Sequence, residues 1–93
     1  DVTFISKKST SVEEVNAALK AAASLDRWKK VFTITEEELV SSDILGEPYG
    51  AIADLNMTRV IDGNLVKVMA WYDNEMGYAH TLVEHVLEVA KHI

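Results

Sequence analysis

Asn74 and Tyr78 are the two residues of this sequence whose types and setting best suit ligand chemistry. They lie in the stretch Trp-Tyr-Asp-Asn-Glu-Met-Gly-Tyr, residues 71–78, which follows an apolar, β-favouring run at 65–69. An asparagine amide holds donors and an acceptor, so a fixed Asn74 can match a carboxamide or a sugar in one orientation. Tyr78 lies about one helical turn further on and offers a flat apolar wall. The pattern is that of a ligand-site rim where a strand gives way to a helix.

The same stretch also fits a purely structural interpretation. Trp71-Tyr72 would pack the end of a strand, and Asp73-Asn74 would form a turn. Glu75 would then open a helix, and Gly77 would permit a tight contact between helix and strand. Periodicity alone does not decide between the two interpretations.

The histidines give a weaker signal for chemistry. His80 and His85 are five positions apart, which turns them to different sides of a helix, and His92 lies near the last residue. His85 and Glu88 could share one face, but two ligands do not complete a zinc site. We therefore expect no metal site and interpret the histidines as ordinary helix residues.

Ser41-Ser42-Asp43 and the glycines do not predict catalysis. A serine nucleophile needs a base within reach and an oxyanion hole, and the sequence indicates neither, so a turn or strand entry is favoured. The four glycines are scattered, which excludes a dinucleotide fingerprint and a P-loop. We expect no catalytic residue in this chain.

Composition and charge limit the partners. The 93 residues suffice for one domain or part of one, and 48% hydrophobic with 26% charged residues is typical of a globular chain. A net charge of −6 argues against nucleic acid and anionic membrane surfaces as partners. The chain has no cysteine, which excludes disulfides and a cysteine nucleophile and fits a reducing, cytoplasmic location. It also starts without methionine inside an alternating pattern, so we expect residues 1–93 to be part of a larger protein, a processed N-terminus being the alternative.

Five segments have the β-branched and aromatic composition of strands. They are residues 1–6, 31–34, 51–55, 58–61 and 64–72, the last being the longest. Asp62-Gly63 predicts a hairpin turn before the last strand, because type I′ turns need positive φ at both central residues. The more apolar face of that return strand should lie against covering helices; it consists of Val66, Val68, Ala70 and Tyr72.

Helical spacing marks two further segments. Ser11 and Glu14 have capping-box spacing ahead of an alanine-rich stripe, which predicts a helix over about 12–24. After Gly77 the apolar period changes again and predicts a C-terminal amphipathic helix. Thr35 could cap a single turn through Glu38, and residues 46–50 form the clearest loop. The order predicts an α+β fold: a mostly antiparallel sheet covered on one face by two helices.

The string from Tyr72 to Tyr78, preceded by Leu65-Val66-Lys67-Val68 and Trp71, closely resembles the C-terminal region of glyceraldehyde-3-phosphate dehydrogenases. Asp1-Val2-Thr3 resembles the Asp-Leu-Thr of a strand in that family's catalytic domain. Leu39-Val40-Ser41-Ser42-Asp43 resembles its Val-Ser-Ser-Asp string. The resemblance extends over nearly the whole chain. It implies that residues 1–93 are the C-terminal segment of the catalytic domain, without the dinucleotide-binding domain and the catalytic cysteine and histidine.

The resemblance implies oxidative phosphorylation of an aldehyde, in glycolysis or gluconeogenesis, with NAD or NADP accepting hydride. In the family the Asn of this motif bonds the nicotinamide carboxamide, a role that falls to Asn74, and the final Tyr lies beside the ring, a weaker role for Tyr78. Ala79-His80-Thr81 departs from the family's usual Ser-Asn-Arg or Ser-Cys-Arg. That departure also admits a relative such as an erythrose-4-phosphate dehydrogenase.

Two hypotheses of different classes follow. The first is that the chain is a fragment of such an oxidoreductase. The fragment would be inactive by itself, because none of its residues can form the thiohemiacetal. The complete enzyme would bind a phosphorylated aldehyde and form a homotetramer. The second is a stand-alone acidic, non-catalytic interaction module that associates with itself through unpaired sheet edges.

Overall fold

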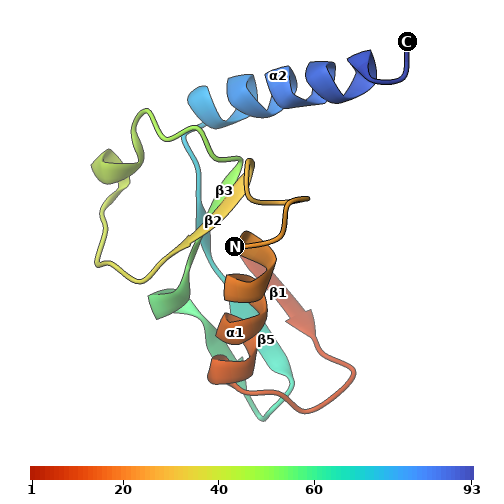
Figure 1. Cartoon of the computed structure of the whole chain (residues 1–93). Coiled ribbons are helices and arrows are strands. Elements are labelled where there is room, and N and C mark those ends of the chain that lie inside the picture. Colours follow the sequence, from red (N-terminus) through yellow and green to blue (C-terminus); the bar gives the residue numbers. More distant parts are fainter.

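The computed structural model describes residues 1–93 and places six short strands and two α-helices along the chain, with two 3₁₀ turns between them (Figure 1). The elements in chain order are β1 (Val2–Ile5), α1 (Val12–Ala23), β2 (Phe32–Thr35), η1 (Ser41–Ile44), β3 (Ala51–Asp54), η2 (Leu55–Met57), β4 (Arg59–Ile61), β5 (Leu65–Val68), β6 (Ala70–Trp71) and α2 (Met76–Ala90). The predicted α+β class is confirmed.

The strands form two three-stranded sheets instead of the one sheet that the sequence predicted. In the first, of order β1-β5-β4, both pairings are antiparallel. In the second, of order β2-β3-β6, β2 and β3 run parallel while β3 and β6 run antiparallel. Antiparallel pairing therefore predominates, as expected.

The predicted return strand over 64–72 divides at Met69 into β5 and β6, which belong to different sheets. The Met69 carbonyl accepts the Asp54 N–H at 2.9 Å, so the chain begins to pair with β3 there. Because of this change of partner, the predicted apolar face of the return strand was wrong for its second half. Val66 is buried and Val68 half-buried, whereas Ala70 and Tyr72 are exposed.

The turn between β4 and β5 is the one that Asp62-Gly63 predicted. Asp62 has φ 53° and Gly63 has φ 74°, and the Asn64 N–H donates to the Ile61 carbonyl at 3.2 Å. Both central residues are thus left-handed, as a primed hairpin turn requires. This turn positions β5 between β4 and β1.

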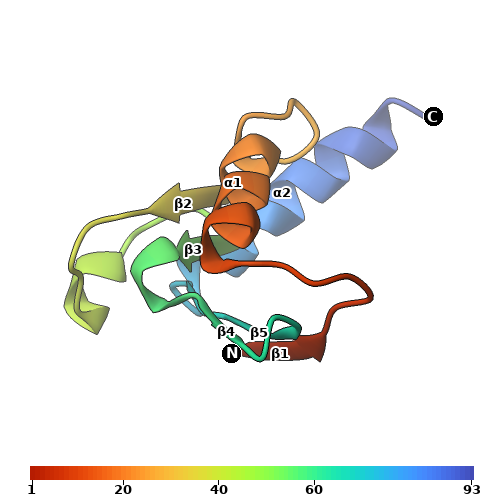
Figure 2. The same cartoon turned by 90° about the horizontal axis from the view of Figure 1, so that it is seen from below.

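Helix α1 begins where the capping pattern predicted. The Ser11 hydroxyl accepts the Glu14 N–H at 3.2 Å, but the Glu14 carboxylate accepts the Thr10 hydroxyl at 3.0 Å in place of the cap amide. Asn16 anchors the helix, because its amide donates to the Leu55 carbonyl at 3.1 Å. Figure 2 shows α1 lying over the sheet that contains β1, β4 and β5.

Thr35 does not start a helical turn. It is the last residue of β2, and its hydroxyl accepts the Glu37 N–H at 3.1 Å. The backbone bends there and continues without regular structure to η1. The expectation of a turn over 35–38 was wrong, because the side-chain hydrogen bond offers the backbone an alternative to helix.

Helix α2 forms as predicted but does not cover a sheet face. It extends away from both sheets (Figure 1), and Gly77 is its only buried residue. Its apolar side chains are consequently exposed; they include Leu82, Val83, Val86, Leu87 and Val89. The expectation of two covering helices thus holds for α1 alone. Neither helix is long and apolar enough to cross a membrane.

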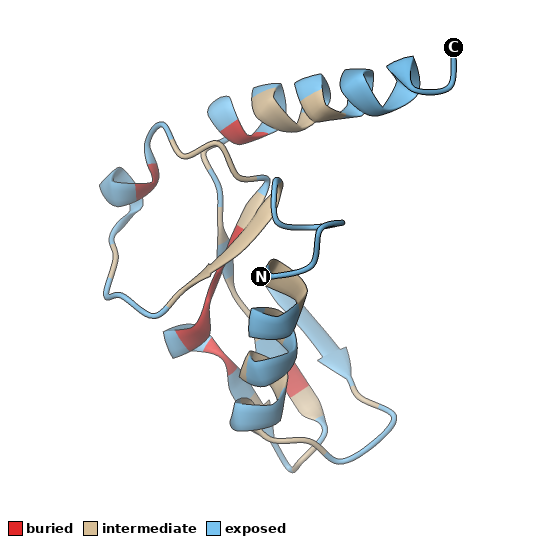
Figure 3. Ribbon diagram, in the orientation of Figure 1, coloured by how far each residue is buried: buried red, intermediate tan, exposed pale blue.

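The core is small and draws its residues from β3, β5 and the two 3₁₀ turns (Figure 3). Its buried hydrophobic residues are Ile44, Ile52, Ala53, Leu55 and Val66. The Asp54 carboxylate is buried beside them and accepts the Trp71 indole N–H at 2.9 Å. This hydrogen bond fastens the end of β6 immediately before the residues of interest.

Candidate functional site

Asp73 organises the corner at which β6 gives way to α2. One oxygen of its carboxylate, Oδ1, accepts the N–H groups of Glu75 at 2.8 Å and Met76 at 3.0 Å. The other oxygen, Oδ2, accepts the Gly46 N–H at 2.9 Å. The first two amides belong to the start of α2, where backbone N–H groups lack partners within the helix. Asp73 therefore caps α2 and ties the helix start to the 46–50 loop.

These three N–H donors hold the pKa of the Asp73 carboxyl below its usual value of 3.8, the Gly46 bond contributing most. Hydrogen bonds to the ionised form favour that form. Asp73 is thus a carboxylate at neutral pH, and its charge lies at the positive end of the α2 dipole.

Gly77 allows the first turn of α2 to lie against the same loop. A Cβ at this position would come 2.5 Å from the Tyr49 carbonyl oxygen, closer than any side chain tolerates. The close approach of helix to loop therefore requires glycine. The sequence predicted a tight contact at Gly77, but with a strand instead of this loop.

Asn74 lies at a cleft of about 360 Å³ between this corner and η1. The cleft is lined by Ser41, Ser42, Ile44, Leu45, Tyr72, Asp73 and Asn74. The hydrogen bonds of the corner use Asp73, while the exposed Asn74 amide keeps its donors and acceptor for another molecule. The structure thus joins the Ser41-Ser42 segment to Asn74, which lies more than thirty positions later.

The serines contribute hydroxyl groups to the cleft without forming a nucleophilic pair. The carboxylate of neighbouring Asp43 accepts the Val40 N–H at 2.9 Å, which makes it part of the η1 turn. This agrees with the structural turn that the sequence favoured. The chemistry available in the cleft is hydrogen bonding to a polar ligand.

Tyr78 does not line the cleft with Asn74. It is the third residue of α2, and 71% of its surface is exposed. The aromatic residue that lines the cleft is Tyr72. The pairing of Asn74 with Tyr78 in one ligand site stays a prediction. Trp71, by contrast, packs structurally through its bond to Asp54.

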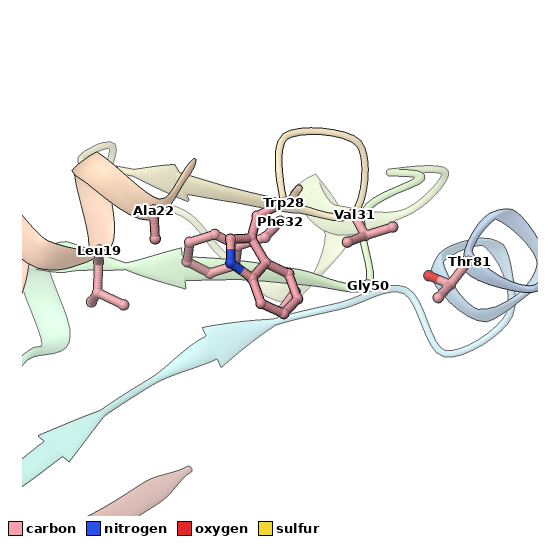
Figure 4. A pocket seen from close by; sticks show the side chains of 8 residues that line it. Leu19, Ala22, Trp28, Val31, Phe32, Gly50 and Thr81 are labelled. Atoms are coloured by element: carbon pink, nitrogen blue, oxygen red, sulfur yellow. The ribbon is translucent and has the colours of Figure 1, made fainter. Parts of the chain in front are cut away.

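A second cavity, of about 410 Å³, lies between α1, β2 and the start of α2 (Figure 4). Six of its eight lining residues are hydrophobic, among them Trp28 and Phe32. The Thr81 hydroxyl, the polar group seen there, already donates to the Gly77 carbonyl at 2.8 Å. Ligand sites need a few polar groups that fix orientation. We interpret this cavity as loose packing beneath α2.

The histidines of α2 and His92, which follows the helix, are not gathered into a site. His80 lies 3.9 Å from Glu84, and His92 lies 3.8 Å from Glu88. No group of three or more potential metal ligands occurs in the structure.

Comparison with known proteins places these features in a family. The family model described as "Glyceraldehyde 3-phosphate dehydrogenase, C-terminal domain" matches residues 1–74, which include both strings that line the cleft. The chain belongs to this family.

Individual relatives extend the match. The glyceraldehyde-3-phosphate dehydrogenase of Mycobacterium avium is 47% identical over 91 residues, covering 98% of this chain and 26% of the relative. That of Geobacillus stearothermophilus is 48% identical over 84 residues, covering 90% and 25%. That of Zymomonas mobilis is 40% identical over 91 residues, covering 98% and 27%. The chain thus spans about a quarter of the length of these relatives.

Asp73 is the residue whose importance sequence reasoning missed. Local pattern placed it in a turn, and an Asp two or three residues before a helix is a recognisable capping signal. Its bond to Gly46 has no such local signal, because the partner lies 27 residues earlier.

Proposed function

We propose that this chain supplies the nicotinamide-orienting part of an NAD- or NADP-dependent oxidoreductase of the glyceraldehyde-3-phosphate dehydrogenase type. Asn74 would bond the carboxamide of the nicotinamide and thereby choose the ring face that receives hydride. The observation that carries the proposal is the unengaged Asn74 amide at a cleft, beside the hydrogen-bonded Asp73 corner.

The corner suits this role because it fixes the backbone on both sides of Asn74. Asp73, the residue before Asn74, accepts the Gly46 N–H of the loop. The N–H of Glu75, the residue after Asn74, donates to the same carboxylate. An amide held in this way discriminates between ligand orientations better than one on a free loop, since less conformational entropy is lost on binding. Tyr78 would have a lesser, packing role outside the cleft.

The remaining chemistry would come from outside residues 1–93. Hydride leaves from a covalent adduct in this type of reaction, and the chain has no cysteine to form it. We therefore expect no dehydrogenase activity from this chain alone. A phosphorylated aldehyde as substrate, a glycolytic role and a homotetrameric assembly belong to the complete enzyme under this proposal.

A chimeric enzyme tests the proposal. Residues 1–93 replace the matching segment of the Geobacillus stearothermophilus relative, to which the chain is 48% identical. Loss of a ligand hydrogen bond typically costs about 1 kcal/mol or somewhat more, so Asn74→Ala should lower kcat/KM about tenfold. A deuterium-labelled cofactor should also show weaker selection of the nicotinamide face. Asn64→Ala, in the exposed β4–β5 turn, is the matched control and should change neither quantity.

An active chimera in which Asn74→Ala matches its parent in rate and facial selectivity would contradict the proposed role. The alternative function is an acidic, self-associating module without catalysis, which the exposed apolar side chains of β1 and α2 favour. It predicts a chimera without activity together with a native chain that folds and associates.

A further inference from the structure

Asp62 is the one aspartate of this chain whose carboxylate has no partner. Every other aspartate accepts a hydrogen bond or pairs with a lysine; these are Asp1, Asp26, Asp43, Asp54 and Asp73. Asp62 is exposed in the β4–β5 turn, and neither a side chain nor a backbone group engages its carboxylate. That carboxyl group is therefore free to react.

The residue after Asp62 supplies a group with which it can react. Gly63 follows it, and the Gly63 N–H has no hydrogen-bond acceptor. No other aspartate or asparagine of the chain precedes a glycine. Because glycine has no Cβ, its backbone nitrogen is open to approach by the preceding side chain. An aspartyl carboxyl beside such a nitrogen can close a five-membered imide ring.

We propose that Asp62-Gly63 is a site of spontaneous isoaspartate formation. The Gly63 nitrogen attacks Cγ of Asp62, a C–N bond forms, and the carboxyl hydroxyl leaves with the amide proton as water. Water then adds across one of the two C–N bonds of the imide. Opening at Cγ restores aspartate, whereas opening at the backbone carbonyl leaves the chain linked through the side chain. The balance requires no oxidant or reductant, because water is the only molecule that leaves and enters.

The closed turn keeps the two reacting groups apart. Asp62 has φ 53°, in the left-handed region. Ring closure needs the Gly63 nitrogen on the same side of the Cα–C bond as Cβ of Asp62, and in the left-handed region it lies on the opposite side. The Asn64 N–H holds this conformation by donating to the Ile61 carbonyl at 3.2 Å. The turn must therefore open before the imide can form.

The segment between β1 and α1 holds the turn closed. The Thr10 N–H donates to the Gly63 carbonyl at 2.7 Å, and the Ser6 N–H donates to the Asn64 carbonyl at 2.8 Å. Ser9 lies over the same glycine, because a Cβ placed on Gly63 would come 3.7 Å from the Ser9 hydroxyl oxygen. The rate of imide formation should consequently follow the opening of residues 6–10 away from the turn.

Conversion to isoaspartate would disturb the sheet that the turn positions. The backbone of the turn becomes one atom longer, because it then runs through Cβ and Cγ of Asp62. Two-residue primed turns match the twist of the strands that they join, and the register here pairs Val60 with Val66. Val66 is fully buried, so a displaced β5 removes a side chain from the core. We expect the converted chain to be less stable than the parent.

Mass spectrometry of the aged 93-residue chain measures the reaction. The chain is incubated in water enriched in oxygen-18, either folded in buffer or unfolded in guanidinium chloride, and is digested with trypsin in ordinary water. Cleavage after Arg59 and Lys67 gives a peptide of residues 60–67 with one aspartate. Hydrolysis of the imide adds the heavy oxygen and creates a second chromatographic peak of this peptide. The peptide of residues 21–27, in which Arg27 follows Asp26, is the internal control and should stay unlabelled.

The label should enter residues 60–67 more than about tenfold more slowly in the folded chain than in the unfolded chain, because the turn opens only transiently. Thr10→Pro removes the N–H that donates to Gly63 and should raise the folded-state rate about fivefold, as the typical free energy of one hydrogen bond implies. Thr10→Val is the matched control, since it keeps that N–H and loses only the hydroxyl bond to Glu14. Asp62→Glu cannot close a five-membered ring and should abolish the labelling.

Amide exchange covers the case that Thr10→Pro fails to fold. Exchange of the Asn64 N–H reports the opening of the turn, so its slowing on folding should match the slowing of the labelling. An unfolded chain without label in residues 60–67 would overturn the site. Equal labelling of folded and unfolded chains, or a folded Thr10→Pro variant that reacts at the parent rate, would overturn the control by residues 6–10. None of these outcomes bears on the role of Asn74.

Discussion

The Asp73 carboxylate accepts the N–H of Gly46 at 2.9 Å across 27 positions of sequence. Through this bond the start of α2 and the loop before β3 become one corner, with Gly77 lying against Tyr49 on its inner side. The cleft that holds Asn74 borders this corner. The position of Asn74 therefore depends on the carboxylate of its neighbour Asp73.

Replacement of Asp73 by asparagine should destabilise the corner. The amide offers one acceptor oxygen where the carboxylate offers two, so the bond to Gly46 or those to Glu75 and Met76 must be lost. The midpoint of urea denaturation should fall for Asp73→Asn. Asp26→Asn is the control, because Asp26 makes a surface ion pair with Lys29, and should cause little change.

The Asp73 bonds also predict a pH dependence of stability. The three N–H donors lower the pKa of Asp73 in the folded state below 3.8, its usual value. Because the pKa of Asp73 is lower in the folded state, the stability that these hydrogen bonds contribute is complete above the pKa of the unfolded state. It is lost as the pH falls through the pKa of the folded state. Urea midpoints measured from neutral pH to below 3.8 should converge for the parent chain and Asp73→Asn. A constant difference between the two midpoints would contradict this.

Gly77→Ala should destabilise the chain although alanine favours helix. A Cβ there would meet the Tyr49 carbonyl oxygen at 2.5 Å, so the helix or the loop must shift. Overpacking of this kind typically costs about 1–3 kcal/mol, which exceeds the gain of about 1 kcal/mol in helix propensity. Thermal or urea unfolding measures the net effect. Ala79→Gly, at an exposed position of the same turn, reports the propensity term alone.

Trp71→Phe should destabilise the junction between β3 and β6. It removes the indole N–H that donates to Asp54 at 2.9 Å and leaves an oxygen of a buried carboxylate without this partner. Loss of one partner of a buried polar group costs about 1–3 kcal/mol. Trp28→Phe is the matched control, since Trp28 is partly exposed and stacks with Arg27 instead. Equal effects of the two replacements on the free energy of unfolding would refute this account of Trp71.

Much of the fold follows from patterns that are local in sequence. The Ser11 cap, the Asp62-Gly63 turn and the period of α2 each depend on residues within a few positions of one another, and each forms as expected. Hydrogen bonds and steric limits between near neighbours are set by residue type. The family resemblance of the 72–78 string is likewise visible without coordinates.

The tertiary structure decided what depends on partners distant in sequence. The division of the return strand at Met69 arises because the chain leaves one sheet and pairs with β3, a choice that strand propensity does not encode. The cleft that Ser41 and Ser42 share with Asn74 likewise joins distant segments, which the Gly46–Asp73 bond holds together. The sequence was enough to identify Asn74 as a candidate, whereas long-range packing determined which residues surround it. Residue types determine local geometry, but only the folded chain determines which surfaces meet.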